Sequence, residues 1–195
     1  LSYTPATGEV KAHLGGLYFA NGVALGPHDR FILVNETGAG RILRLWLKGE
    51  RAGQSEVFAE GLPGYVDNLS FNGRDTFWVA LPGLRDPLLE ATASMPWLRK
   101  LIAELPDSVL LPPEGGIGFV LGFGVDGTLL HNLQDPDGSY HTITSVNEWH
   151  GKLYLGSLKM ASVGVLAAPD SGSFRNESFP ACGETGSRRA HSPCP

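Results

Sequence analysis

A four-strand pattern that repeats with a period in the mid-forties is the feature that most constrains the fold of this chain. Residues 18–60 hold four apolar segments separated by turns: YFANGVAL, RFILVNE, RILRLWLK and SEVFAE. The pattern begins again at GYVDNLSF and a third time at HTITSVNEW. Asn21 and Asp67 occupy matching places in two successive first segments, about 46 positions apart. Such a unit predicts the blades of a β-propeller, and a β-sandwich with irregular loops is the alternative.

A segment with helical spacing interrupts the second set between its second and third strands. It includes DPLLEATASMPWLRKLIAEL, in which apolar residues recur three and four positions apart and Pro96 separates two short helices. Removing about 34 residues from the interval between Asp67 and Ser145 leaves about 44, which restores the period. We therefore expect an all-β partial propeller over residues 1–168, with a helical insertion at residues 83–116.

The number of blades is smaller than a closed ring requires. A closed propeller typically has four to eight blades, an arrangement that leaves only short, protected sheet edges. This chain holds about three sets of strands and begins at Leu1 rather than at Met. We therefore expect it to be the C-terminal half of a larger propeller. Residues 169–195 show almost no strand pattern, and we expect a disordered or non-domain tail there.

The composition is that of a globular protein. Hydrophobic residues make up 42% of the chain, charged residues 18%, and the net charge is -5, which fits a folded domain. An acidic balance without a basic face argues against a nucleic-acid partner. No apolar run of about 18 residues indicates a membrane span, and no signal peptide is visible. Both cysteines, Cys182 and Cys194, lie in the tail, so the compartment stays undetermined.

Two polar pairs inside apolar first strands are candidates for a metal site. The first strand of each blade lines the central channel, so the side chains of Asn21 and Asp67 should converge there. Unpaired polar groups in an apolar channel are costly, and a cation would satisfy them. Calcium prefers carboxylate and amide oxygens, and Asn68 would add a third ligand. The alternative is that Asn-Gly and Asp-Asn are simply turn pairs.

The order of these motifs resembles the strictosidine synthase-like family, which includes the adipocyte plasma membrane-associated protein and lies near the paraoxonases and gluconolactonases. The resemblance rests on FANGVAL, FILVNETGAGRILRLWLKGERAGQSEVFAEGLPGYVDNL and LQDPDG followed by ITSVNEWHGKLYLGSL. It implies a six-bladed propeller in which Asn21, Asp67 and Asn68 are calcium ligands. The family's remaining ligands, an acidic residue and an asparagine from earlier blades, would lie upstream of Leu1.

One position argues against strictosidine synthesis itself. The family's synthase uses a glutamate as acid and base, and the aligned residue here is Thr144, four residues before Glu148. A threonine hydroxyl cannot transfer protons as a carboxylate does near neutral pH. The resemblance instead implies a calcium-dependent hydrolase of esters or lactones, an arylesterase or lactonase. The alternative is a truncated, non-catalytic propeller fragment or binding scaffold.

No general base can be assigned from the sequence. His141 opens the first strand of the last blade and is a weak catalytic candidate, whereas His150, Glu148 and Trp78 are expected to have structural roles. In the insertion, Met95, Trp97 and Leu98 either form an apolar lid over a pocket or pack on the propeller face. Asn68 begins a glycosylation sequon but is expected to be buried.

Overall fold

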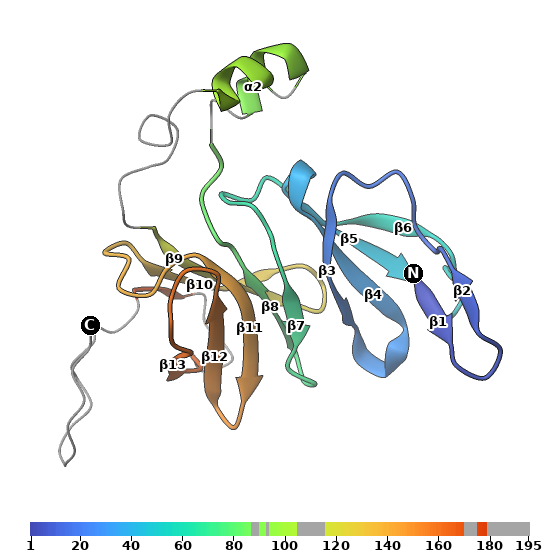
Figure 1. Cartoon of the computed structure of the whole chain (residues 1–195). Coiled ribbons are helices and arrows are strands. Elements are labelled where there is room, and N and C mark those ends of the chain that lie inside the picture. The colour runs from blue at the N-terminus through green and yellow to red at the C-terminus, as the bar shows by residue number, and fades with distance from the viewer. Residues whose placement is uncertain (87–89, 93, 105–115, 170–174, 179–195) are drawn as a thin grey trace.

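Three sheets, each built around an antiparallel meander like a propeller blade, form the body of the protein (Figure 1). The computed structural model describes residues 1–86, 90–92, 94–104, 116–169 and 175–178. The first sheet runs β3 (Ala20–Leu25), β4 (Phe31–Glu36), β5 (Arg41–Trp46), β6 (Ser55–Ala59), with each strand antiparallel to the next. Short 3-10 turns follow β3 and β4: η1 (Pro27–Asp29) and η2 (Thr37–Ala39). This sheet is the four-stranded meander that the sequence predicts.

The second and third sheets repeat the meander. The second contains β7 (Leu69–Phe71), β8 (Thr76–Ala80), β9 (Gly118–Gly124) and β10 (Leu129–Asp135) in that order. The third contains β11 (Ile143–Trp149), β12 (Lys152–Ser157) and β13 (Gly164–Ala167). A separate hairpin, β1 (Ser2–Thr4) with β2 (Glu9–Lys11), precedes the first sheet. The first strands β3, β7 and β11 lie next to one another, as the inner strands of successive blades must.

Two hydrophobic clusters hold the blades together. In β8, alternate side chains face opposite sides, so Phe77 and Val79 pack toward the first blade while Trp78 and Ala80 pack toward the third. Every residue of β8 is buried. A strand buried on both faces must be apolar throughout, which explains the run TFWVA. Burying one such large side chain stabilises the fold by about 1.5–3 kcal/mol.

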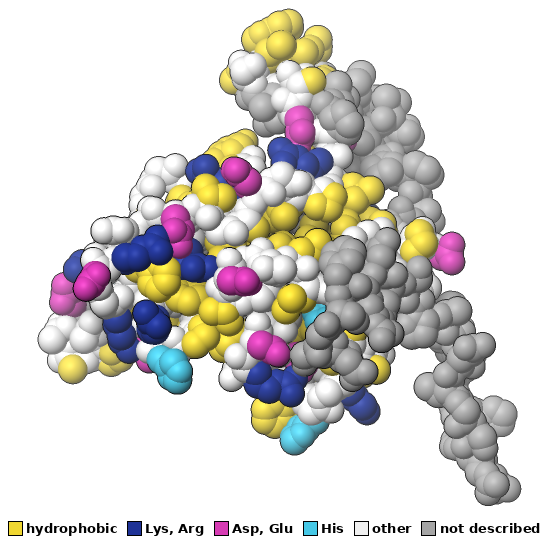
Figure 2. All heavy atoms as spheres, turned by 180° about the vertical axis from the view of Figure 1, so that it is seen from behind, with side chains coloured by type: hydrophobic (Ala, Val, Ile, Leu, Met, Phe, Trp, Pro, Cys, Tyr) yellow, Lys and Arg dark blue, Asp and Glu magenta, His cyan; other side chains and the backbone are white. Residues whose placement is uncertain are grey.

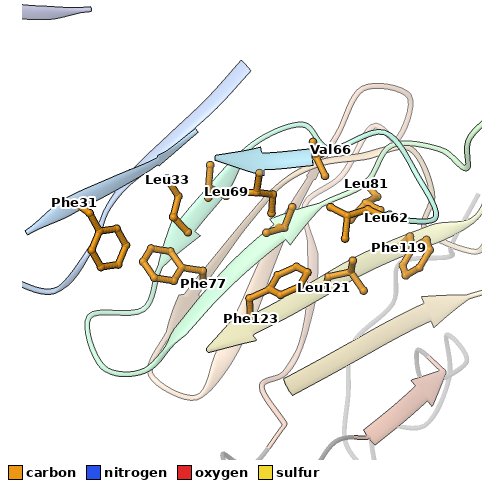
Figure 3. Close-up of a cluster of buried hydrophobic side chains, with 12 residues drawn as sticks. Phe31, Leu33, Leu62, Val66, Leu69, Phe77, Leu81, Phe119, Leu121 and Phe123 are labelled. Atoms are coloured by element: carbon orange, nitrogen blue, oxygen red, sulfur yellow. The ribbon is translucent and has the colours of Figure 1, made fainter. Parts of the chain in front are cut away.

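The cluster between the first and second blades is the larger of the two (Figure 3). Several aromatic rings contact one another in it, with Phe71 and Phe77 at a centroid distance of 4.6 Å and Phe31 and Phe77 at 6.0 Å. Its buried members are Phe31, Leu33, Ile42, Leu62, Val66, Leu69, Phe77, Val79, Leu81, Phe119, Leu121 and Phe123. The second cluster joins Trp78 and Val120 to Ile143, Val146, Leu153 and Leu155.

The insertion leaves the second blade where the sequence predicts, between β8 and β9. Its helix α2 (Pro96–Ala103) begins with Pro96 in the first turn, where a missing backbone N–H costs nothing. Part of the first of the two predicted helices, residues 87–89 and 93, lies outside the described residues. No helix in the described ranges is long and apolar enough to cross a membrane.

One strand lies in the segment that the sequence assigns to a disordered or non-domain tail. β14 (Arg175–Ser178) pairs in parallel with β10, at the outer edge of the second blade. Residues 170–174 and 179–195 lie outside the described part of the chain, so the prediction for the tail as a whole stays a prediction.

Candidate metal centre

The inner strands are in a register that makes Asn21, Asp67 and Thr144 equivalent. The backbone N–H of Gly22 donates to the carbonyl of Asp67 at 3.2 Å, and that of Asn68 donates to the carbonyl of Thr144 at 3.2 Å. In both pairs of neighbouring blades, the residue after the equivalent position donates its backbone N–H to the carbonyl at the equivalent position of the next blade. The matching places of Asn21 and Asp67 in the repeat correspond to matching places in the fold.

The pair Asn21–Gly22 is not a hairpin turn, because both residues lie within β3. The ladder between β3 and β4 shifts register between Ala20 and Val23, so the pair sits at an irregularity of the strand. A Cβ atom on Gly22 would lie 2.6 Å from both Asn68 Cα and Asp67 O. Glycine is therefore needed because the inner strands of two blades approach closely here.

Two of the predicted ligand residues contact the carboxylate of the third, Asp67. The Asn21 side chain forms a hydrogen bond with it. The Nδ2 of Asn68 donates to Asp67 Oδ1 at 3.2 Å and to the carbonyl of Thr144 at 2.8 Å. Asn21 and Asp67 are half-buried, whereas Asn68 is exposed. The expectation that Asn68 is buried is therefore wrong, because its side chain reaches across the inner strands toward the third blade instead of into the core.

Burial makes ionisation of Asp67 unfavourable. It raises the pKa of the Asp67 carboxyl above its ordinary value, and the hydrogen bond from Asn21 opposes that change only in part. Neutral amides stabilise a carboxylate less than a cation does. A carboxylate that is desolvated and flanked by amides therefore matches the donor set of a hard cation such as calcium.

The segment before β7 is fixed by two side chains of the first blade that the sequence analysis did not identify. Asn35 Nδ2 donates to the carbonyl of Asp67 at 2.6 Å, and Thr37 Oγ1 donates to the carbonyl of Val66 at 2.6 Å. Asn35 is fully buried, and its Oδ1 has no hydrogen-bond partner. The signal was the polar sequence NET directly after the apolar run FILV. Asn35 also begins the glycosylation sequon Asn-Glu-Thr, and its side chain is buried in the folded chain.

The donor set is incomplete for calcium by itself. Asn21, Asp67 and Asn68 offer one carboxylate and two amide oxygens, whereas calcium takes six to eight oxygens. Within the described ranges no three His, Cys, Asp or Glu residues cluster closely enough to hold a metal ion. The three residues fit a part of a calcium shell.

The weak catalytic candidate His141 lies just before β11. Its Nδ1 is 2.8 Å from the hydroxyl of Thr142, and its carbonyl accepts a hydrogen bond from Ser157 at 2.7 Å. Among the described residues, no hydrogen bond or ion pair joins His141 to Asp67. Its catalytic role stays a prediction.

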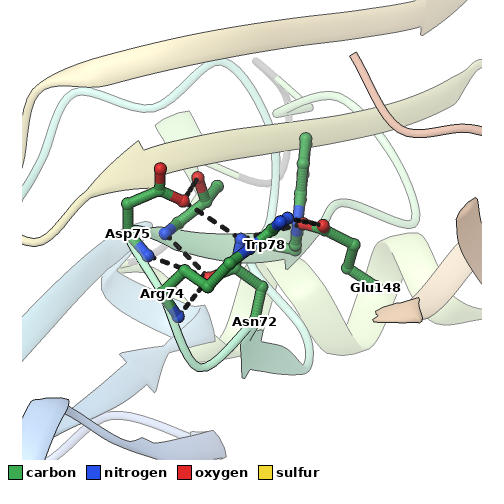
Figure 4. Close-up of polar contacts among 6 residues, drawn as sticks. Asn72, Arg74, Asp75, Trp78 and Glu148 are labelled. Atoms are coloured by element: carbon green, nitrogen blue, oxygen red, sulfur yellow. Dashed lines mark hydrogen bonds and ion pairs between the residues drawn. The ribbon is translucent and has the colours of Figure 1, made fainter. Parts of the chain in front are cut away.

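Glu148 has the structural role expected of it (Figure 4). Its Oε2 accepts hydrogen bonds from Trp78 Nε1 at 2.8 Å and from Asn72 Nδ2 at 2.9 Å, and its Oε1 forms an ion pair with Arg74. The carboxylate thereby ties the third blade to the second. Trp78 is buried, and His150 lies in an exposed turn with positive φ, so both match their structural expectations.

Comparison with known proteins agrees with this description. The family described as Strictosidine synthase matches residues 1–50. Strictosidine synthase-like 10 of Arabidopsis thaliana is 37% identical over 175 residues, which cover 85% of this chain and 46% of that protein. The human adipocyte plasma membrane-associated protein is 34% identical over 165 residues, 82% of this chain and 40% of its own length.

Solved structures show the same fold. A gluconolactonase of Xanthomonas campestris superposes with a TM-score of 0.53 at 16% identity, covering 85% of this chain and 43% of that chain. Regucalcin of Agrobacterium tumefaciens, described as a calcium-binding protein, gives a TM-score of 0.50 at 16% identity, covering 79% and 43%.

The repeated antiparallel sheets form a partial β-propeller, the fold that the gluconolactonase and regucalcin structures share, which confirms the predicted fold class. Within that class the chain belongs to the strictosidine synthase-like family. It spans less than half the length of the curated relatives it matches.

Proposed function

We propose that this chain forms part of a calcium-dependent hydrolase of esters or lactones. The observation that carries the proposal is the Asp67 carboxylate, which lies where the three inner strands meet. Burial raises its pKa, and two side-chain amides contact it. The gluconolactonase and regucalcin likeness supports the lactone class and the metal. The substrate class, the metal and the roles of these residues are part of the proposal.

Each residue has a distinct task in this proposal. Asp67 would supply the charged ligand, and Asn21 and Asn68 would supply amide oxygens. Both described hydrogen bonds of the Asn68 side chain use Nδ2, which leaves its Oδ1 for the cation. When bound, calcium polarises a carbonyl and stabilises negative charge that develops on its oxygen. Asn35 and Thr37 hold the segment before β7 in place while the ligands engage.

Strictosidine synthesis is not proposed for this chain. Thr144, the residue aligned with the synthase glutamate, directs its hydroxyl to the carbonyl of Gly156 at 3.4 Å. A hydroxyl in this place offers no carboxylate for proton transfer near neutral pH.

A second candidate, a non-catalytic fragment or binding scaffold, rests on the incomplete donor set. Three oxygen-donating side chains leave a calcium shell unfinished, so this chain alone should bind the ion weakly and hydrolyse little. Turnover of phenyl acetate or a δ-lactone by the 195-residue chain, abolished by EGTA, would rule out this candidate.

The metal assignment is tested by calorimetric calcium titration of a longer chain that carries the remaining blades. Asp67→Ala should abolish calcium binding and chelator-sensitive ester turnover together. Asp137→Ala is the matched control, because Asp137 is an exposed carboxylate on another loop. Unchanged calcium affinity in Asp67→Ala would show the metal assignment to be wrong.

A further inference from the structure

The helix of the insertion exposes a stripe of large apolar side chains. Trp97 and Leu101 lie one turn apart on α2, with exposed fractions of 68% and 63%. Met95, directly before the helix, is also exposed, whereas Leu98 and Ile102 are half-buried. Figure 2 shows apolar side chains gathered at this end of the molecule. One side of the apolar face of the helix is therefore half-buried, and the other is exposed.

The stripe projects from the same end of the blades as the candidate metal centre. Asp67 and Asn68 bracket Ala80 through the hydrogen bonds Asp67 N–H to Ala80 O and Ala80 N–H to Asn68 O, both 3.0 Å. The chain runs directly from Ala80 into the insertion, and α2 stands beyond the ends of the sheets (Figure 1). Whatever α2 contacts lies at the end of the propeller where Asp67 is found.

The chemistry of the stripe fits a lipid surface better than a protein partner. Two side chains on an eight-residue helix and a third directly before it offer a small area, whereas a stable protein interface buries about 800 Å² on each partner. A bilayer interface, by contrast, takes up single side chains, and an indole beside aliphatic residues is a favoured composition there. Lys100 is exposed on the same helix, and Arg99 precedes it in the sequence.

We propose that α2 is an interfacial anchor that docks this end of the propeller on an anionic lipid bilayer. Trp97, Leu101 and Met95 enter the boundary between headgroups and acyl chains, and Lys100 contacts anionic headgroups. The net charge of -5 opposes adsorption of the protein as a whole. Attachment therefore depends on this local combination of apolar and cationic side chains, and it does not depend on the proposed hydrolase activity.

Vesicle flotation tests the anchor. The protein should float with vesicles of phosphatidylcholine and phosphatidylserine in a 7:3 ratio, more weakly with phosphatidylcholine alone, and equally well in EGTA. The double variant Trp97→Ser/Leu101→Ser should bind roughly tenfold or more weakly, because two large apolar side chains no longer leave water. Lys100→Glu should weaken binding only to the vesicles that contain phosphatidylserine.

The matched control is Trp149→Ser/Leu25→Ser, at the C-terminal ends of the inner strands β11 and β3, opposite to the end that carries the insertion. These two residues are exposed by 66% and 52%, so the control removes a tryptophan and a leucine from another face of the molecule. It should float as the unmodified protein does. Equal binding by Trp97→Ser/Leu101→Ser and the unmodified protein, or equal loss in the control, would overturn the anchor. Sedimentation velocity would also overturn it if the stripe drove self-association while the protein failed to float.

Discussion

The side-chain amide of Asn35 donates a hydrogen bond to the backbone carbonyl of Asp67 at 2.6 Å, linking the first blade to the second. The same carbonyl accepts the backbone N–H of Gly22 at 3.2 Å. The main chain of the central candidate ligand is thus held by a neighbouring blade, while its carboxylate remains available. The position of Asp67 is a property of the contact between blades rather than of β7 alone.

Replacing Asn35 should weaken that contact. Asn35→Ala removes one hydrogen bond, but the carbonyl of Asp67 keeps its bond from Gly22, and the unpaired Oδ1 of Asn35 is removed as well. We expect the free energy of unfolding to fall by about 1 kcal/mol in a urea titration. Asn147→Ala, at an exposed position of β11, should stay within about 0.5 kcal/mol of the parent. Equal effects of the two variants would contradict the role given to Asn35.

Because the pKa of Asp67 is raised, ionisation of its carboxyl should lower the free energy of unfolding. The folded state binds the carboxyl proton more tightly than the unfolded state does, so protonation of Asp67 favours folding. This contribution to stability is fully present below the ordinary pKa of 3.8, and it is lost as the pH rises through the folded pKa. In EGTA at neutral pH, Asp67→Asn should therefore be more stable than the parent. The advantage should disappear at low pH, and it is checked by urea titrations across this window.

Asp126 supplies a control of opposite sign. Hydrogen bonds from the backbone and hydroxyl of Thr128 lower the pKa of the Asp126 carboxyl. Its contribution is therefore present above its unfolded pKa and is lost as the pH falls through the folded pKa. Asp126→Asn should be less stable than the parent at neutral pH. If Asp67→Asn and Asp126→Asn changed stability in the same direction, the assignment of Asp67 as a desolvated carboxyl would be wrong.

Periodicity explains why so much of the fold could be predicted from the sequence. The four-strand unit, the insertion after β8 and the equivalence of Asn21 and Asp67 all follow from patterns along the chain. The bonds of Asn35 and Thr37 to the next blade do not, because a local pattern does not say which backbone carbonyl a buried amide or hydroxyl will meet. The pairing of β14 with β10 and the exposure of Asn68 likewise depend on contacts distant in sequence.

Glu148 and Trp78 should be energetically coupled. Glu148→Ala leaves the indole N–H of the buried Trp78 without the acceptor that now lies 2.8 Å away, and it also releases Asn72 and Arg74. We expect a loss of about 3 kcal/mol, since a buried donor is left unpaired and a charged network is broken. In the Trp78→Phe background the same change should cost less. Additive losses in this double-mutant cycle would show that the two residues act independently.

Gly22 should tolerate no side chain, because its space is taken by the main chain of the next blade. A Cβ atom there would lie 2.6 Å from Asn68 Cα and from Asp67 O, and neither atom can rotate away as a side chain could. Gly22→Ala should therefore separate β3 from β7 and lower the free energy of unfolding by about 1–3 kcal/mol. In the longer chain it should also weaken calcium binding, because Asn21 and Asp67 would no longer meet. Gly15→Ala is the control, since no heavy atom lies within 4 Å of its added Cβ. Urea titration and calorimetry measure both effects, and a Gly22→Ala protein as stable as Gly15→Ala would show that the inner strands do not require this close approach.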